Sequence, residues 1–386
     1  MNFKPLIEFL DNYVPMLGIP GSDTVVFRNH EEIFRHTTGY DDIQFGTPMR
    51  KDALYNMYSI TKLSLATAAM QLIERGEIML NDPLYAYFPE YRDVTVKDWK
   101  STGECDRVPA KSPILIKHLL TMTAGFNYNT RVKAIQDAER EANGSPTTLD
   151  IVSALAAEPL DFHPGESFRY SLCHDVMGGV IEVATGMKLG EYMKKYIFEP
   201  LGMNNTGFER TPEIFDRVAE QYQKNKDGSI VKMDKTKNFS VFGDKYESGG
   251  AGLISTVDDQ ILLADALASR GVGRTGERIL SSFAVDLLHR NAIEGDVLLE
   301  FERTVATGGK QGYGYGLGVR VNINPQKSGN IAPLSEFGWD GAMGSYVLAD
   351  TTTGISVFHA EHVSGFSSHP MVHPRLRNLV FSCIGE

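Results

Sequence analysis

The chain has 386 residues, of which 42% are hydrophobic and 23% are charged, which is enough apolar sequence to bury a large core. Its formal net charge of −11 argues against a nucleic-acid partner, because phosphate binding requires a basic face. No apolar run is long enough to cross a bilayer and no basic amphipathic helix is visible, so we expect no membrane partner.

The N-terminal segment, residues 1–17, carries apolar residues at helical spacing and predicts an amphipathic helix. Glu8 and Asp11 interrupt what would be the apolar stretch of a signal peptide, so we expect a cytoplasmic protein. The three cysteines show no CxxC spacing and agree with reduced thiols in that compartment.

The pattern along the chain predicts strands at both ends and helices between them. Two β-rich runs around residues 29–30 indicate an N-terminal hairpin, strand patterns return in the last third, and a helical tail covers about 370–384. The helices of the middle each end at a glycine, namely Gly76, Gly125, Gly186, Gly202 and Gly271. We therefore predict an α/β protein of the α+β type, in which terminal helices flank an antiparallel sheet beside a mainly helical region.

A hydroxyl and an ammonium interrupt the apolar helix pattern "NMYSITKLSLATAAM". Ser59 and Lys62 lie three residues apart, so they share one helix face. A lysine in a dry pocket loses affinity for its proton, and the neutral amine can then accept the proton of a serine nucleophile. The same Ser-x-x-Lys spacing recurs at Ser229 and Lys232, where an Asp-Gly turn predicts an exposed hairpin without catalytic function.

Two further stretches carry candidate chemistry. Tyr170, in "PGESFRYS", precedes a helix and could share a proton there, with a core tyrosine as the alternative. Gly341 and Gly344, in "FGWDGAMGSYVLAD", lie at a strand start, where missing side chains let a substrate approach the backbone. A backbone N–H of this strand could join that of Ser59 in holding an oxyanion, with an ordinary glycine-rich strand entry as the alternative.

Three elements follow one another along the chain: the helix with Ser59 and Lys62, the segment with Tyr170, and the strand entry with Gly341 and Gly344. In this order they resemble the serine β-lactamase and penicillin-binding-protein superfamily, and within it class C β-lactamases and family VIII carboxylesterases. Similar landmarks run along nearly the whole chain, including "IKHLLTMTAGF", "PLGMNNTGF", "SGGAGLISTVDD" and "GYGYGLGV". The resemblance implies a β-lactamase/transpeptidase-like fold in a single catalytic domain, residues 1–386. Its sheet region would comprise about 1–60 and 245–386, and its helical region about 61–244.

The resemblance also implies roles for particular residues. Ser59 would be the acylated nucleophile, and Lys62 and Tyr170 the pair that moves its proton. The N–H groups of Ser59 and Ala342 would form the oxyanion hole. Substrate-binding roles would fall to the residues at the family's second and third motifs, Leu172, Trp339, Asp340 and Gly341.

Two departures from the family pattern point to the substrate. The Tyr-x-Asn motif reads Tyr-Ser-Leu here, so Leu172 replaces an amide, and Trp339 replaces the cation of the Lys-Thr-Gly motif. In β-lactamases and peptidases these groups hold the substrate's amide and carboxylate. Family VIII esterases resemble the chain at both places, so the resemblance favours esters with apolar parts.

We therefore expect a serine hydrolase that acts through an acyl-enzyme, and specifically a carboxylesterase on a small-molecule ester or amide substrate. The alternatives are a β-lactamase or D-amino-acid peptidase or amidase, an acyltransferase, and a non-catalytic binding protein of the same fold. No cofactor is expected. We also expect no metal, because the histidines near the C-terminus lack a metal-binding spacing; these are His359, His362, His369 and His373. The sequence leaves the oligomeric state open.

Overall fold

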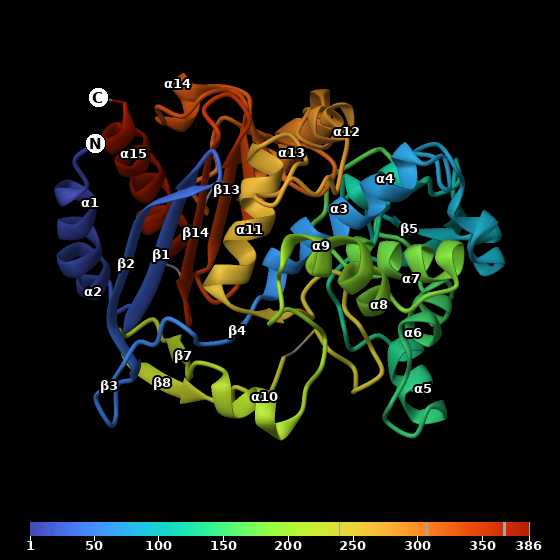
Figure 1. Ribbon diagram of the computed structural model, residues 1–386. Coiled ribbons are helices and arrows are strands. Elements are labelled where there is room, and N and C mark those ends of the chain that lie inside the picture. Colours follow the sequence, from blue (N-terminus) through green and yellow to red (C-terminus); the bar gives the residue numbers. More distant parts are fainter. Residues whose placement is uncertain (239, 306–307, 366–367, 386) are drawn as a thin grey trace.

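The computed structural model describes residues 1–238, 240–305, 308–365 and 368–385. Eight strands form one antiparallel sheet in the order β10-β11-β12-β13-β14-β1-β2-β3 (Figure 1). The strands are β1 Gly21–Arg28, β2 Glu31–Asp42, β3 Thr47–Pro48, β10 Tyr313–Tyr315, β11 Arg320–Asn322, β12 Glu336–Asp340, β13 Tyr346–Asp350 and β14 Ile355–Glu361. The pairing of β1 with β14 joins the two ends of the chain in one sheet.

The predicted N-terminal hairpin is present, and its turn lies where the sequence placed it. Asn29 and His30 connect β1 to β2 with φ angles of 52° and 73°, which is typical of the two-residue turns that match strand twist. The backbone N–H of His30 donates to the buried carboxylate of Asp265 over 3.1 Å, and its Nδ1 lies 2.7 Å from the same group. This contact ties the turn to a helix on the face of the sheet.

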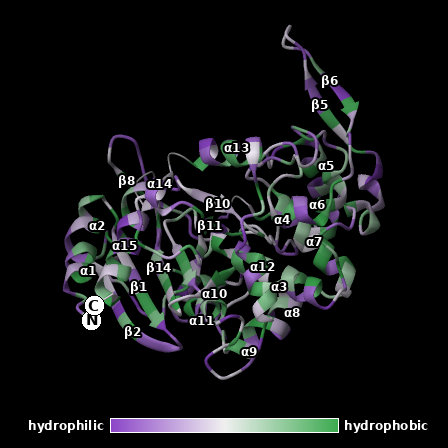
Figure 2. Ribbon diagram, turned by 90° about the horizontal axis from the view of Figure 1, so that it is seen from above, coloured by the Kyte–Doolittle hydropathy of each residue, from purple (hydrophilic) through white to green (hydrophobic). Residues whose placement is uncertain are grey.

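Alternate residues of the strands face two separate cores. Val25 and Phe358 belong to the larger core, whereas their neighbours Val26 and Val357 pack into a second core with the terminal helices. The chain termini lie side by side in both ribbon views (Figures 1 and 2). The terminal helices are α1 Lys4–Glu8, a π-helical turn Phe9–Tyr13, α2 Val14–Met16, a π-helical turn Ser368–Val372 and α15 His373–Ile384.

The larger core lies between the other face of the sheet and the helical region. Helix α11, Val257–Ala268, packs directly on β13, β14 and β1, while α3, Thr61–Glu74, is buried along most of its length. The remaining helices are α4 Ile116–Leu120, α5 Lys133–Glu141, α6 Thr148–Leu155, α7 Cys173–Thr185, α8 Leu189–Met193, α9 Glu199–Leu201, α10 Pro212–Arg217, α12 Ser282–Leu288, α13 Gly295–Val305 and α14 Pro325–Ser328. The predicted antiparallel sheet, terminal helices and helical region are confirmed.

One helix ends earlier than its sequence pattern suggests. The pattern continues to Gly125, but α4 stops at Leu120 because Met122 adopts a left-handed φ of 58°. The N–H of Thr123 then bonds to the carbonyl oxygen of His118 over 2.9 Å and closes the turn. The chain beyond this point can therefore run back across the core toward the site described below.

Short two- and three-stranded sheets lie outside the main sheet. The hairpin β5–β6, Thr95–Trp99 and Cys105–Pro109, extends away from the body in Figure 2. A second hairpin, β7–β8, Gln221–Lys224 and Ile230–Met233, joins β15, Val363–Ser364. Strand β4, Tyr55–Asn56, pairs with β9, Ile254–Ser255, immediately before the Ser59 segment.

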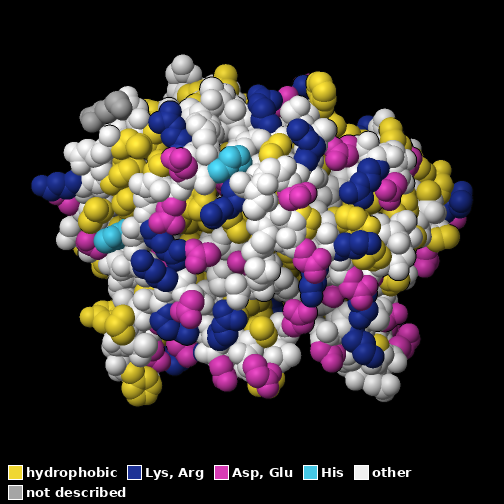
Figure 3. Space-filling view, viewed as in Figure 1, with side chains coloured by type: hydrophobic (Ala, Val, Ile, Leu, Met, Phe, Trp, Pro, Cys, Tyr) yellow, Lys and Arg dark blue, Asp and Glu magenta, His cyan; other side chains and the backbone are white. Residues whose placement is uncertain are grey.

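The surface mixes charges of both signs. Basic and acidic side chains are interspersed across the face shown in Figure 3, without a continuous basic area on that face. Within the described residues, none of the helices combines the length and apolarity needed to cross a bilayer.

The packing of α11 on the sheet predicts a large stability effect. Leu267→Ala removes a fully buried side chain and leaves a cavity, so the free energy of unfolding should fall by about 2–5 kcal/mol. Leu299→Ala is the matched control in α13, because Leu299 is 50% exposed and its loss should cost under about 0.5 kcal/mol. Urea unfolding of both variants measures the difference, and equal effects would contradict this packing.

Candidate active site

A strained turn places Ser59 at the start of α3. After β4 the chain passes through Tyr58, whose φ of +46° is one that a bulky side chain rarely adopts, and continues in a 3₁₀ turn, Tyr58–Ile60. Burial holds this conformation, since Tyr58 is 2% exposed and its hydroxyl donates to Oε1 of Gln221 over 3.2 Å. Ser59 itself is only half-buried, so its hydroxyl remains open to a substrate.

Lys62 lies one helical turn beyond Ser59 and is completely buried. Its Nζ lies 3.3 Å from Ser59 Oγ, 3.0 Å from the hydroxyl of Tyr128 and 2.7 Å from the carbonyl oxygen of Gly250. A neutral amine has two N–H donors and one lone pair. If the donors serve Gly250 and Tyr128, the lone pair is left for the hydroxyl proton of Ser59.

The electrostatic environment favours that neutral form. Burial lowers the pKa of Lys62 to about 7, and the negative charge of Asp175 opposes part of this effect. Asp175 is itself buried, which raises the pKa of its carboxyl group, and it accepts hydrogen bonds from Tyr246 and Ser248. Lys62 is therefore poised to accept and release a proton near neutral pH.

Tyr170 completes the group of side chains around Ser59. Its hydroxyl shares a hydrogen bond with the Ser59 hydroxyl and accepts another from Nε1 of Trp339 over 3.0 Å. Burial raises the pKa of Tyr170, which keeps it a neutral phenol. Lys62 Nζ lies over the ring of Tyr170, 4.6 Å from its centroid. The structure thus brings together the three residues that the sequence predicted.

Tyr128 was not predicted from the sequence. It follows Gly125 in the stretch that crosses the core after α4, and its ring lies 5.5 Å from that of Tyr170. Burial raises the pKa of Tyr128 well above its ordinary value, so its hydroxyl stays protonated beside Lys62. Nothing in its local sequence separates Tyr128 from the other tyrosines of the chain.

The end of β12 lies against the Ser59 segment. A Cβ atom on Gly341 would lie 3.0 Å from the carbonyl oxygen of Met57, so the absence of a side chain permits this close approach. The next residue, Ala342, is half-buried and begins a turn in which the N–H of Gly344 bonds to the carbonyl oxygen of Gly341 over 3.0 Å. The oxyanion-hole role of the Ala342 N–H stays a prediction, and the close approach of Gly341 to Met57 is compatible with it.

Two of the predicted substrate-binding residues are buried. Leu172 is 1% exposed and belongs to the larger core, directly before the first residue of α7. Asp340 is 6% exposed and forms ion pairs with Lys310 and Arg320. Both side chains therefore present little surface in this structure, and their substrate-binding roles stay predictions. Trp339 is also mostly buried, at 5% exposure, and its indole N–H is committed to Tyr170.

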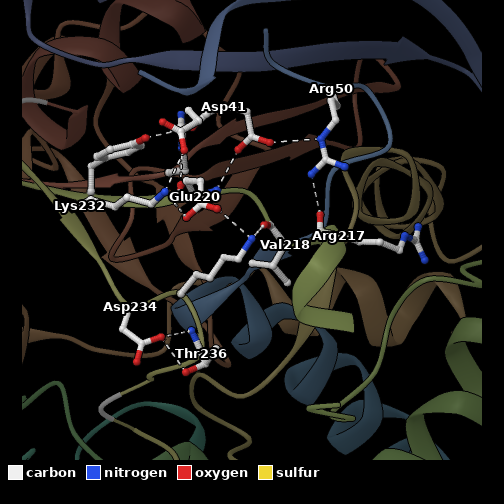
Figure 4. Close-up of polar contacts among 12 residues, drawn as sticks. Asp41, Arg50, Arg217, Val218, Glu220, Lys232, Asp234 and Thr236 are labelled. Carbon is white, nitrogen blue, oxygen red and sulfur yellow. Dashed lines mark hydrogen bonds and ion pairs between the residues drawn. The ribbon is translucent and has the colours of Figure 1, made fainter. Parts of the chain in front are cut away.

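The second Ser-x-x-Lys copy, Ser229 and Lys232, has different surroundings, and Figure 4 shows Lys232 beside Glu220. Lys232 lies in β8, where its Nζ makes ion pairs with Asp42 at 2.8 Å and Glu220 at 3.2 Å. Ser229 donates instead to Oδ1 of Asp227 over 2.6 Å. The two side chains take separate partners on the surface hairpin, as expected for residues without a catalytic function.

Several known proteins are similar to this chain in sequence or in fold. The model of the family described as Beta-lactamase matches residues 6–366. Protein Rv1367c of Mycobacterium tuberculosis (strain ATCC 25618 / H37Rv) is 29% identical over 348 residues, covering 88% of this chain and 85% of the relative. Esterase EstB of Burkholderia gladioli is 29% identical over 356 residues, covering 87% and 84%. The solved structure of EstCE1, "a hydrolase with promiscuous acyltransferase activity", superposes with a TM-score of 0.77 at 24% identity and covers 97% of each chain.

The geometry predicts that only one of the two Ser-x-x-Lys copies is reactive. Ser59→Ala should lower ester turnover at least about a thousandfold, because it removes the nucleophilic oxygen that lies 3.3 Å from Lys62 Nζ. Ser229→Ala, the control, should leave turnover unchanged. The assay is release of nitrophenol from a nitrophenyl ester, and comparable activity in Ser59→Ala would contradict the assignment.

The pKa of Lys62 predicts a pH profile. The amine must be neutral to accept the proton, so kcat/KM should rise with pH, by about tenfold per unit well below pH 7, and level off above it. Asp175→Asn removes a negative charge that raises this pKa, so the rising limb should move to lower pH. Initial rates with an uncharged ester between pH 5 and about 9 measure both curves. A flat wild-type profile would show that Lys62 is not the base.

Proposed function

Because the chain belongs to the beta-lactamase family, we propose that it is a serine hydrolase whose acyl-enzyme forms on Ser59, and specifically a carboxylesterase for small esters with apolar groups. Family membership and the esterase and acyltransferase relatives support the class of acyl-transferring serine enzymes. The observation that carries the narrower proposal is the hydrogen bond from Trp339 Nε1 to Tyr170.

The first half of the reaction uses the side chains around Ser59. Ser59 Oγ attacks the ester carbonyl carbon while its proton passes to the lone pair of Lys62. The backbone N–H groups of Ser59 and Ala342 stabilise the oxyanion of the tetrahedral intermediate. As the C–O bond to the alcohol breaks, the Lys62 ammonium returns the proton to the leaving oxygen, and Tyr170 hydrogen-bonds to the reacting oxygens.

The second half reverses these roles with water in place of the alcohol. Lys62 takes a proton from water, and the hydroxide oxygen attacks the acyl carbon. The ester bond to Ser59 then breaks, Ser59 regains its proton, and the acid is released. Tyr128 donates no proton in this scheme and serves to orient the Lys62 amine through its 3.0 Å contact.

The residues beside Ser59 favour an ester over a carboxylate-bearing amide. Trp339 stands where related enzymes carry a cation, and its N–H is used by Tyr170. One cation close to it, Lys310, lies 5.5 Å from the centroid of the Trp339 ring and is paired with Asp340, so its charge is balanced. A substrate carboxylate would lose hydration here without gaining an ionic partner. An acyltransferase, in which an alcohol replaces water, is the second candidate, because EstCE1 is described with both activities.

A substrate panel tests the proposal. The kcat/KM for short and medium acyl nitrophenyl esters should exceed that for a chromogenic cephalosporin by at least about a hundredfold, or about 2.7 kcal/mol of transition-state stabilisation. Adding a small alcohol to the same reactions measures transfer, as the ratio of new ester to free acid. Equal rates on cephalosporin and ester would replace the carboxylesterase by a β-lactamase. A majority of new ester in dilute alcohol would favour the acyltransferase.

A further inference from the structure

A cluster of titratable side chains surrounds the carboxylate at the end of β12. Asp340 forms an ion pair with Lys310, lies 3.5 Å from Nη1 of Arg320 and lies 3.8 Å from Nδ1 of His373. His369 also belongs to this group. One ring nitrogen of His369, one ring nitrogen of His373 and one carboxylate oxygen of Asp340 lie within 4.8 Å of one another. We call these residues the Asp340 cluster; they are Lys310, Arg320, Asp340, His369 and His373.

The cluster holds both ends of the backbone segment that faces Ser59. The Nε2–H of His373 donates to the carbonyl oxygen of Gly344 over 2.9 Å, and His369 is hydrogen-bonded to the backbone of Gly341. These two glycines bracket Ala342, whose N–H is assigned to the oxyanion hole. On the other side, Lys310 Nζ lies 5.5 Å from the centroid of the Trp339 ring. The cluster therefore contacts the residues before and after Ala342 as well as the partner of Tyr170.

A metal ion would be an alternative occupant of this place. An aspartate with two histidines is a common ligand set, and within the described residues Nδ1 of His373 has no hydrogen-bond partner. The charges nevertheless already balance. Asp340 and Glu336 are matched by Lys310 and Arg320, since Arg320 also pairs with Glu336 at 2.9 Å. A divalent cation would add two uncompensated positive charges in a buried site, which favours the ion pairs over a metal.

We propose that Asp340 is a positioning residue, whose buried ion pairs with Lys310 and Arg320 fix the turn 341–344 so that the Ala342 N–H points at the oxyanion formed on Ser59. This inference rests on the proposed acyl-enzyme chemistry of Ser59 and goes beyond it. The geometric demand is high, because an oxyanion donor acts only within a few tenths of an ångström of its correct place. Asp340 would hold the Ala342 N–H in that place from a buried position, without contacting the substrate itself.

Asp340→Asn tests the role of the charge. The variant keeps the shape of the side chain but leaves Lys310 and Arg320 without their shared carboxylate, so the strand end should shift. We expect the rate at which a fluorophosphonate probe labels Ser59, and kcat for a nitrophenyl ester, to fall about ten- to hundredfold, with KM changed less than about threefold. Adding Lys310→Met removes the unpaired ammonium but does not restore the ion pairs, so the labelling rate should stay low; full recovery would mean that the unpaired charge alone caused the loss.

Asp265→Asn is the matched control. Asp265 is a fully buried carboxylate that contacts His30, as Asp340 contacts His373, but it lies in α11 and anchors the hairpin turn. Its loss should lower the thermal unfolding midpoint and leave the labelling rate of Ser59 within about twofold of the wild type. This separates a positioning effect from general destabilisation. If Asp340→Asn does not fold, His373→Gln gives the deciding measurement, with a slower labelling rate expected.

The outcomes distinguish this inference from the proposed function. A wild-type protein that is labelled at Ser59 but hydrolyses no ester would refute the carboxylesterase, while the labelling comparison would still decide the role of Asp340. Labelling of Asp340→Asn, or of His373→Gln if that variant is used, within twofold of the wild-type rate would overturn the inference. So would one equivalent of tightly bound metal by elemental analysis whose removal slows labelling, because a metal site would then replace the ion pairs.

Discussion

The buried amine of Lys62 is the constraint around which the site is organised. An ammonium without solvent is costly, so the protein must either neutralise it or surround it with acceptors. Gly250, Tyr128 and Ser59 supply three contacts in different directions, and burial brings the pKa to about 7. These partners come from distant parts of the chain. The fold therefore has to bring α3, the stretch after α4 and the loop before β9 to one point before Lys62 can act as a base.

The strand end that faces Ser59 makes two different contacts within three residues, at Trp339 and at Gly341. Trp339 orients Tyr170 through its indole N–H, and the glycine after Asp340 allows the backbone to approach Met57 closely. Under the proposed function, a cation at position 339 would offer a partner to a substrate carboxylate, whereas the indole N–H is bonded to the hydroxyl of Tyr170. The identity of residue 339 would then affect both substrate choice and the way in which Tyr170 is held.

Buried charge is concentrated behind this strand end. Arg320 is 1% exposed and contacts both Glu336 and Asp340, so two neighbouring strands are linked by ion pairs inside the core. Such pairs add little net stability compared with apolar packing, but breaking one leaves an unpaired buried charge. They therefore suit a place where a precise geometry is worth more than stability, which is the condition at an oxyanion hole.

The sequence by itself determined the main sheet, the terminal helices and the helical region, and it singled out Ser59, Lys62 and Tyr170. Local signals were sufficient for the hairpin at Asn29 and for a serine and a lysine on one helix face, because turns and helix periodicity depend on near neighbours. Only the tertiary structure decided the rest. Tyr128 reaches Lys62 because Met122 reverses the chain, and Leu172 points into the core although its motif position suggested a substrate contact. Which way a side chain points, and which distant group it meets, depends on packing between segments, and that information is not contained in any local pattern.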